Sequence, residues 1–223
     1  TQREMAVMRR VETASKNPDS HFFAFGSRAF EAFATTFFAA SSTRCDFAGN
    51  CWRKLSIVCL ASNQLSRAIS MSIFPIQADS IPPAMDGRDV LACAMTGSGK
   101  TAAFLLPILH RMLGKPREGK HTRALILSPT RELAIQTVEE LNALGVHTPL
   151  SAAAIIGGVG MGPQEHAFRC GVDILVATPG RLLDHFRMPY AKLDKLEYLV
   201  LDEADRMLDM GFLPDIRRVL RHI

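Results

Sequence analysis

The chain has 223 residues, of which 48% are hydrophobic and 22% are charged. That apolar share is sufficient for a buried core and argues against a disordered protein, and the length allows one α/β domain with an extension. The net charge of +4 is compatible with a polyanionic partner but does not identify one.

The five cysteines include no C-x-x-C pair. Their spacing matches no common zinc site, so we expect no structural metal held by cysteine. An odd number of cysteines in an α/β chain is typical of a reducing compartment. We therefore expect an intracellular, cytoplasmic protein.

Residues 1–63 differ in character from the rest of the chain. Eight of the 13 phenylalanines lie between Phe22 and Phe47. Charged side chains interrupt the apolar stretch 21–40, which argues against a membrane span. No basic segment leads into a clean apolar run, so a secretory signal is not expected, whereas a transit peptide remains an alternative. Because this segment has no steady period of 2 or 3.6, we expect a poorly ordered extension.

From about residue 64 the pattern becomes regular, with a short helix predicted at 65–69 and another beginning at Phe74. Apolar strand candidates then alternate with helix candidates, which indicates a parallel sheet covered by helices on both faces. Ligands of such sheets bind beyond the carboxyl ends of the strands. The predicted strands are 89–94, 123–128, 151–156, 173–177 and 198–201, and the predicted helices are 101–113, 131–144, 164–169, 181–186 and 215–222.

A glycine-rich loop follows the first of these strands. Residues 94–101 match the phosphate-loop pattern, except that Ala94 stands in place of its first glycine. Glycines let several backbone N–H groups point at one anion, and the next helix directs its positive dipole end at the same phosphates. Lys100 would reach the β- and γ-phosphates and the Thr101 hydroxyl would hold Mg²⁺, although an ordinary strand–turn–helix with a surface lysine is the alternative. The nucleotide-binding candidates in the loop are Thr96, Gly97, Ser98, Gly99, Lys100 and Thr101.

An acidic motif follows the last predicted strand. Asp202 comes directly after the apolar run 198–201, so it lies at the carboxyl edge of the sheet. A carboxylate there can hold Mg²⁺ while the metal bridges phosphate oxygens, and Glu203 could orient or deprotonate the attacking water. The alternative is a helix start that favours acidic residues. Together with the glycine-rich loop, the motif predicts hydrolysis of a nucleoside triphosphate, with Lys100, Asp202 and Glu203 as the catalytic candidates.

With these motifs in place, the chain resembles the first RecA-like domain of the DEAD-box RNA helicases over about residues 64–223. Residues 202–205 spell Asp-Glu-Ala-Asp, and further family motifs follow the family order. The resemblance implies an α/β fold of the RecA-like P-loop NTPase type, with ATP and Mg²⁺ as cofactors. The other matching segments are Pro-Thr-Arg-Glu-Leu-Ala at 129–134, Gly-Gly at 157–158, Thr-Pro-Gly-Arg-Leu at 178–182, and Gln77.

The resemblance also implies an RNA-binding side. Segments that follow a strand and open a helix offer N–H groups, hydroxyls and a guanidinium to phosphate. Such backbone contacts read little sequence, so RNA binding should be sequence-independent and sensitive to salt. Alternatively, Arg131 and Glu132 form a helix-start ion pair, and 178–180 is only a tight turn. The RNA-binding candidates are Pro129, Thr130, Arg131, Gly157, Gly158, Thr178, Pro179, Gly180 and Arg181.

Adenine recognition is where the chain departs from the family. Gln77 matches the family's adenine-reading glutamine, whose amide can both donate and accept. However, Phe74 stands where the family usually has threonine, and the family's upstream aromatic residue is not evident. Asp205 corresponds to a family residue that bonds a Ser-Ala-Thr motif, which this sequence does not contain.

We therefore expect the ATP-binding domain of an RNA helicase whose second RecA-like domain supplies an arginine finger. By itself the chain should bind Mg·ATP, contact the RNA backbone weakly and turn over little ATP. No membrane partner is expected, and the oligomeric state stays open. The alternatives are a non-catalytic module that binds RNA or a protein partner, and a DNA-directed ATPase of similar fold.

Overall fold

The computed structural model describes residues 4–9, 21–25, 74–115, 117 and 119–223. The helix predicted at 65–69 lies outside the described residues, as does most of the predicted extension 1–63. Within the described part of the chain, no helix combines the length and the apolar character needed to cross a membrane.

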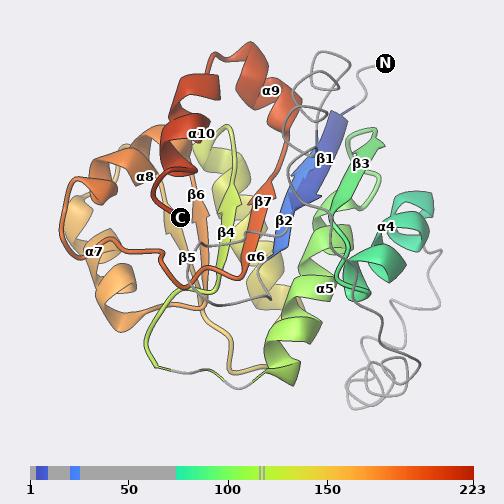
Figure 1. Cartoon of the computed structure of the whole chain (residues 1–223), viewed down its shortest axis with the longest axis horizontal. Helices are drawn as coiled ribbons and strands as arrows, with labels where there is room; N and C mark the ends of the chain where they lie inside the picture. The colour runs from blue at the N-terminus through green and yellow to red at the C-terminus, as the bar shows by residue number, and fades with distance from the viewer. Residues whose placement is uncertain (1–3, 10–20, 26–73, 116, 118) are drawn as a thin grey trace.

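The described strands form one seven-stranded sheet at the centre of the fold, in the order β1-β3-β2-β7-β4-β6-β5, and β1 also pairs with β2 and with β7. In Figure 1, β1 and β2 lie between β3 and β7. The pairs β7–β4, β4–β6 and β6–β5 are parallel. The predicted strands are therefore confirmed, and their ends shift by at most one residue. The strands in question are β3 (Val90–Ala94), β4 (Ala124–Leu127), β5 (Ala152–Ile155), β6 (Ile174–Ala177) and β7 (Tyr198–Leu201).

Two strands near the N-terminus join this sheet, and the sequence pattern did not predict them. They are β1 (Glu4–Arg9) and β2 (His21–Phe25). Each pairs with both β3 and β7, β1 in the antiparallel and β2 in the parallel direction. They therefore connect the strand before the glycine-rich loop to the strand before the acidic motif. The domain boundary near residue 64 stays a prediction.

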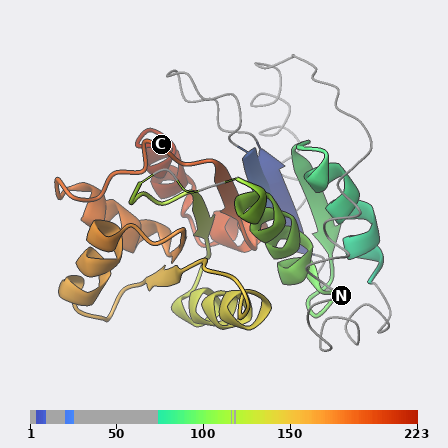
Figure 2. The same cartoon turned by 90° about the horizontal axis from the view of Figure 1, so that it is seen from below.

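Helices cover both faces of the sheet. Figure 2 shows α5 and α6 along one face, with α10 on the other face. In α6 the Thr130 hydroxyl accepts a hydrogen bond from the Leu133 N–H at 3.3 Å, which caps the helix start. The helices are α4 (Pro75–Met85), α5 (Lys100–Gly114), α6 (Arg131–Leu144), α7 (Met161–Cys170), α8 (Pro179–Phe186), α9 (Ala204–Asp209) and α10 (Leu213–Val219).

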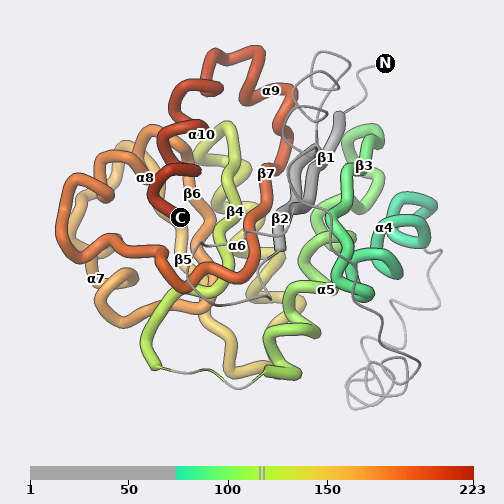
Figure 3. Tube along the Cα trace, in the orientation of Figure 1, coloured from blue at the N-terminus to red at the C-terminus, as the bar shows by residue number. Residues whose placement is uncertain are grey.

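The last predicted helix, 215–222, is wrong at both ends. The chain instead forms α9, which begins within the acidic motif, and then α10, as the tube in Figure 3 shows. Helix α10 begins at Leu213 with a proline in its first turn, where the fixed φ of proline suits a helix start. Between the two helices, Gly211 has φ of 81°, a left-handed conformation that ends α9.

The core lies between the sheet and its helices. Every residue of β4, β6 and β7 is buried, as expected for central parallel strands covered on both faces. Edge strand β5 is only partly buried. Helix α5 contributes Phe104, Leu105 and Ile108, all fully buried, so the helix that follows the glycine-rich loop is held firmly against the sheet.

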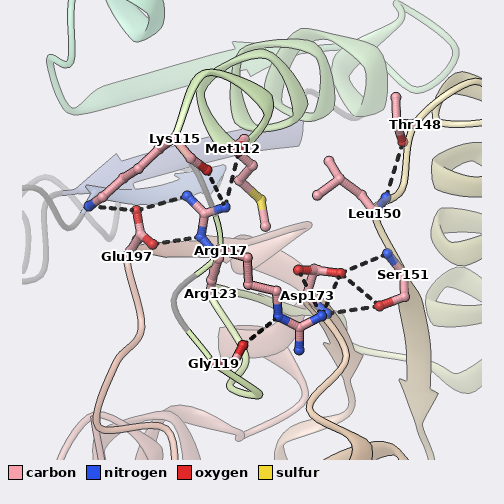
Figure 4. Close-up of polar contacts among 10 residues, drawn as sticks. All are labelled: Met112, Lys115, Arg117, Gly119, Arg123, Thr148, Leu150, Ser151, Asp173 and Glu197. Atoms are coloured by element: carbon pink, nitrogen blue, oxygen red, sulfur yellow. Dashed lines mark hydrogen bonds and ion pairs between the residues drawn. The ribbon is translucent and has the colours of Figure 1, made fainter.

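The amino edge of the sheet carries a polar cluster (Figure 4). Ser151, Arg123, Asp173 and Glu197 each directly precede a strand. Arg123 pairs with Glu197, and the Asp173 carboxylate accepts hydrogen bonds from the Ser151 hydroxyl at 2.7 Å and the Ser151 backbone N–H at 2.9 Å. Arg123 and Arg117 thus pair the buried carboxylates of Glu197 and Asp173 at the strand starts.

Candidate functional site

The glycine-rich loop and the acidic motif lie at the same carboxyl edge of the sheet. The loop follows β3 and opens α5, whereas Asp202 and Glu203 follow β7 and open α9. The two strands run in the same direction, since β2 is parallel to both. The structure thus places the two predicted motifs at one edge.

Lys100 is drawn into the loop rather than extended into solvent. Its side-chain ammonium donates to the Ala94 carbonyl at 2.9 Å and to the Met95 carbonyl at 3.1 Å, and the residue is only 8% exposed. A surface lysine on an ordinary turn would not be buried in this way. The buried charge therefore favours the phosphate-loop interpretation.

The loop backbone fits a bound phosphate. Gly97 and Gly99 adopt left-handed φ values of 76° and 79°, and a Cβ placed on Gly97 would meet nothing within 4 Å. The Ser98 hydroxyl is buried and has no hydrogen-bond partner among the described residues. The open space at Gly97 leaves room for an anion, and the Ser98 hydroxyl could donate a hydrogen bond to it.

Gln77 and Phe74 both lie against the phosphate loop. The Gln77 amide donates to the Gly99 carbonyl at 3.0 Å. A Cβ on Gly99 would collide with that amide and approach Phe74 Cδ2 to 2.9 Å. Only glycine fits here, both for the left-handed backbone and for this close approach. The structure thus joins Gln77 to the loop through one of its two amide donors.

The acidic motif is held in an unusual backbone conformation. Among the described residues, Glu203 is the one non-glycine residue with a positive φ, at 48°. Its carboxylate accepts a hydrogen bond from Arg206 at 3.0 Å, and both Asp202 and Glu203 are 7% exposed. Left-handed backbone at a non-glycine residue costs about 1–3 kcal/mol and is often found at functional sites. The buried Asp202 carboxylate and the Thr101 hydroxyl are oxygen donors of the kind that Mg²⁺ prefers.

Glu140 of α6 is a neighbour of Thr101 that the sequence did not reveal. Burial raises the pKa of the Glu140 carboxyl, and a hydrogen bond with the Thr101 side chain offsets part of that rise. Helices α5 and α6 pack side by side, which brings together residues 39 positions apart. Thr101 therefore has a carboxyl partner close to the position where a metal ligand is predicted.

The predicted RNA-binding groups converge on the turn that follows β5. Arg131 of α6 donates to the Gly157 carbonyl at 3.2 Å, and Arg181 of α8 donates to the Val159 carbonyl. Gly158 has a φ of 77°, and a Cβ there would collide with the Arg131 guanidinium. Two arginines from different helices therefore hold the same glycine turn.

Other RNA-binding candidates occupy helix starts at the same edge. Pro129 and Thr130 lead from β4 into α6, and Thr178 is the residue before α8, whose first turn contains Pro179 and Gly180. Helix starts present free N–H groups, which suits contact with phosphate. The predicted Arg131–Glu132 ion pair is present, but its 3.9 Å separation and high exposure make it weak.

Sequence reasoning missed a hydrogen-bonded group next to this turn, formed by the buried Gln164 and His185 and the partly buried Tyr190. Gln164 is 4% exposed and His185 is fully buried. Burial lowers the pKa of His185, and the nearby Arg181 charge lowers it further. A glutamine in a polar helix and a histidine near the end of a short helix carry no sequence signal of burial, so only the fold reveals them.

Comparison with known proteins shows that this chain is similar to helicases. The family model described as DEAD/DEAH box helicase matches residues 74–223. DEAD-box ATP-dependent RNA helicase 30 of Arabidopsis thaliana is 49% identical over 151 residues, which cover 67% of this chain and 26% of that protein. ATP-dependent RNA helicase vasa of Drosophila melanogaster is 47% identical over 151 residues, covering 67% of this chain and 23% of that protein.

Solved structures of an RNA helicase and of a DEAD-box splicing factor are also similar to this chain. A hypothetical ATP-dependent RNA helicase from Sulfolobus tokodaii superposes with a TM-score of 0.59 at 36% identity, covering 71% of this chain and 45% of that one. The yeast DEAD-box splicing factor Prp28 gives a TM-score of 0.53 at 38% identity, covering 56% and 31%. The fold is therefore RecA-like, as predicted, and the chain spans about a quarter or less of the length of the curated relatives described above.

Proposed function

Because this chain belongs to the DEAD/DEAH box helicase family, we propose that it is the ATP-binding domain of an ATP-dependent RNA helicase. The whole protein would hydrolyse ATP and use the cycle to separate short RNA duplexes in the cytoplasm. The observation that carries the proposal is the buried Lys100 inside a left-handed glycine loop, at the same sheet edge as the buried Asp202 and Glu203.

The nucleotide side follows from the loop chemistry. Backbone N–H groups of the loop and the start of α5 would bind the phosphates, and the Lys100 ammonium would neutralise the β- and γ-phosphate oxygens. Thr101 and Asp202 would hold Mg²⁺, which supplies charge to stabilise the transferring phosphoryl group. Gln77 would hydrogen-bond the adenine base. Its amide is held beside the phosphate loop by the hydrogen bond to the Gly99 carbonyl.

Glu203 is the residue proposed to act on the attacking water. Glu203 directly follows Asp202 in the sequence and is largely buried. Its carboxylate accepts a hydrogen bond from Arg206. A carboxylate in this position can accept a proton from the water or orient it. Hydrolysis by this chain alone should be slow, because a second RecA-like domain is proposed to complete the site.

The RNA side rests on Arg131 and Arg181. Both guanidiniums lie at the carboxyl edge around one glycine turn. Binding through the phosphate backbone would be indifferent to sequence and would weaken steeply with salt. A non-catalytic module is the less favoured reading, since Lys100, Thr101, Asp202 and Glu203 are all present.

The test is ATP hydrolysis by the full-length parent protein, measured alone, with single-stranded RNA and with DNA of the same sequence. We expect stimulation by RNA well above that by DNA, and its loss in Glu203→Gln. Equal stimulation by DNA would favour a DNA-directed ATPase. An ATPase rate that no nucleic acid changes would contradict the helicase proposal.

A further inference from the structure

The buried Gln164 side chain holds the turn 156–160, which follows β5. The Gln164 amide nitrogen donates to the Ile156 carbonyl at 3.0 Å and to the Gly160 carbonyl at 3.4 Å. Gln164 therefore bridges the two ends of the glycine turn 156–160. At 4% exposure, its amide is shielded from water, so these bonds are costly to lose.

The other end of the same amide faces Arg181. Gln164 Oε1 accepts from Arg181 Nε at 3.3 Å and lies 3.2 Å from His185 Nε2. The Arg181 guanidinium also donates to the Val159 carbonyl. The Gln164 carboxamide thus contacts the turn with its nitrogen and Arg181 with its oxygen.

His185 and Tyr190 support this glutamine. His185 Nδ1 lies 3.1 Å from the Tyr190 hydroxyl, and the ring is fully buried. Because Gln164 Oε1 can only accept, the imidazole donates to it from Nε2, and in the neutral ring Nδ1 then accepts from the tyrosine O–H. Phe168 packs against both rings, with centroids 5.2 Å and 5.9 Å away. These contacts hold the orientation of the carboxamide, and burial, which lowers the pKa of His185, favours the neutral ring.

We propose that Gln164 is a positioning residue that sets the direction of the Arg181 guanidinium and the shape of the turn 156–160, with His185 and Tyr190 as its support. The consequence rests on the proposed function: with Gln164 in place, Arg181 and the turn present a preformed surface to the RNA backbone. Without it, Arg181 keeps its charge but loses its fixed orientation, so RNA affinity should fall while nucleotide affinity does not.

The direct test is the NMR signal of the Arg181 Nε–H group, assigned with Arg181→Lys, in the unmutated chain and in Gln164→Met. We expect a resolved, slowly exchanging signal that Gln164→Met abolishes and Gln164→Glu retains, because the carboxylate still accepts from arginine. Asn142→Met, the same loss of a carboxamide at an exposed position of α6, is the matched control and should leave the signal unchanged.

Two binding measurements accompany it. Anisotropy of a fluorescein-labelled oligo(U) should show RNA affinity reduced about tenfold in Gln164→Met, and a fluorescent ATP analogue should bind within about twofold of the unmutated chain. Tyr190→Phe removes only the hydroxyl that orients His185 and should give a smaller loss of RNA affinity, about threefold. It serves as the test variant if Gln164→Met does not fold.

The outcomes separate the two claims. A persistent Arg181 signal in Gln164→Met, or RNA and nucleotide affinity falling together in both Gln164→Met and Tyr190→Phe, would overturn the positioning role. If the unmutated chain binds no oligo(U) while its Arg181 signal depends on Gln164, the positioning claim stands and the proposed RNA contact fails.

Discussion

The Arg123 guanidinium and the Glu197 carboxylate form a two-point ion pair, with Nε donating to Oε1 at 2.6 Å and Nη2 donating to Oε2 at 3.3 Å. Both side chains are almost completely buried. The remaining Arg123 nitrogen, Nη1, donates to the carbonyls of Met112 and Lys115 at the end of α5 (Figure 4). The pair therefore joins the starts of β4 and β7 to the far end of the helix that begins in the phosphate loop.

Removing one member of this pair should be strongly destabilising. Among the described residues, Arg123→Met leaves the buried Glu197 charge with the partly exposed Lys115 as its one ion-pair partner, so we expect the free energy of unfolding in urea to fall by roughly 3–5 kcal/mol. Arg123→Met with Glu197→Leu should recover much of that loss. Arg88→Met, at an exposed ion pair, is the control and should change stability by less than about 1 kcal/mol. Equal losses at both arginines would contradict this.

Buried His185 predicts a pH dependence of stability. Its folded pKa is lowered by burial and by Arg181, whereas the unfolded value is about 6.5. Its contribution is therefore fully present above pH 6.5 and is lost as the pH falls through the lower folded pKa. Urea unfolding between pH 7.5 and pH 5 should show a decline that is shallower in His185→Gln. An identical slope in the two proteins would refute the assignment.

Glu140 predicts the opposite dependence. Because burial raises its folded pKa, the charged form is disfavoured, and the cost is present at neutral pH but absent below the ordinary pKa of about 4.5. Glu140→Gln keeps a side chain that can bond Thr101 and should raise the thermal midpoint at pH 7. That gain should shrink as the pH falls toward 4. The exposed neighbour provides the control, and Glu139→Gln should show no such pH-dependent gain.

Two glycines of α5 and its loop should respond differently to alanine. Gly99→Ala would force a left-handed backbone on a Cβ that meets Gln77 and Phe74, so we expect lower stability and at least tenfold weaker nucleotide binding. Gly114 ends the same helix with open space around it, and Gly114→Ala should be neutral or stabilising by roughly 0.4–1 kcal/mol. Equal effects on nucleotide affinity would show that the loop geometry does not matter.

Local patterns were enough to predict the motifs and most elements. The glycine loop and the acidic strand end are contiguous, and buried parallel strands appear as short apolar runs such as 124–127 and 198–201. Even the burial of Lys100 follows from its loop, because both carbonyls that it contacts lie within six positions.

The rest depends on contacts between distant residues. Arg123 and Glu197 are 74 positions apart, and each appears in the sequence as an ordinary polar residue at the start of a predicted strand or just before it. Gln164 and His185 meet only because α7 and α8 follow neighbouring strands. Strands β1 and β2 pair with β3 and β7 across more than 65 positions, a pairing that no local period encodes.

The central claim is that the glycine-rich loop 94–101, with its buried Lys100, binds the phosphates of Mg·ATP. The most direct measurement is equilibrium binding of a fluorescent ATP analogue with Mg²⁺ to this chain and to Lys100→Ala, with circular dichroism to verify that both are folded. We predict saturable binding that Lys100→Ala weakens by at least tenfold. A folded chain that binds no analogue, or that binds it equally well without the lysine, would contradict the assignment of this loop as the nucleotide site.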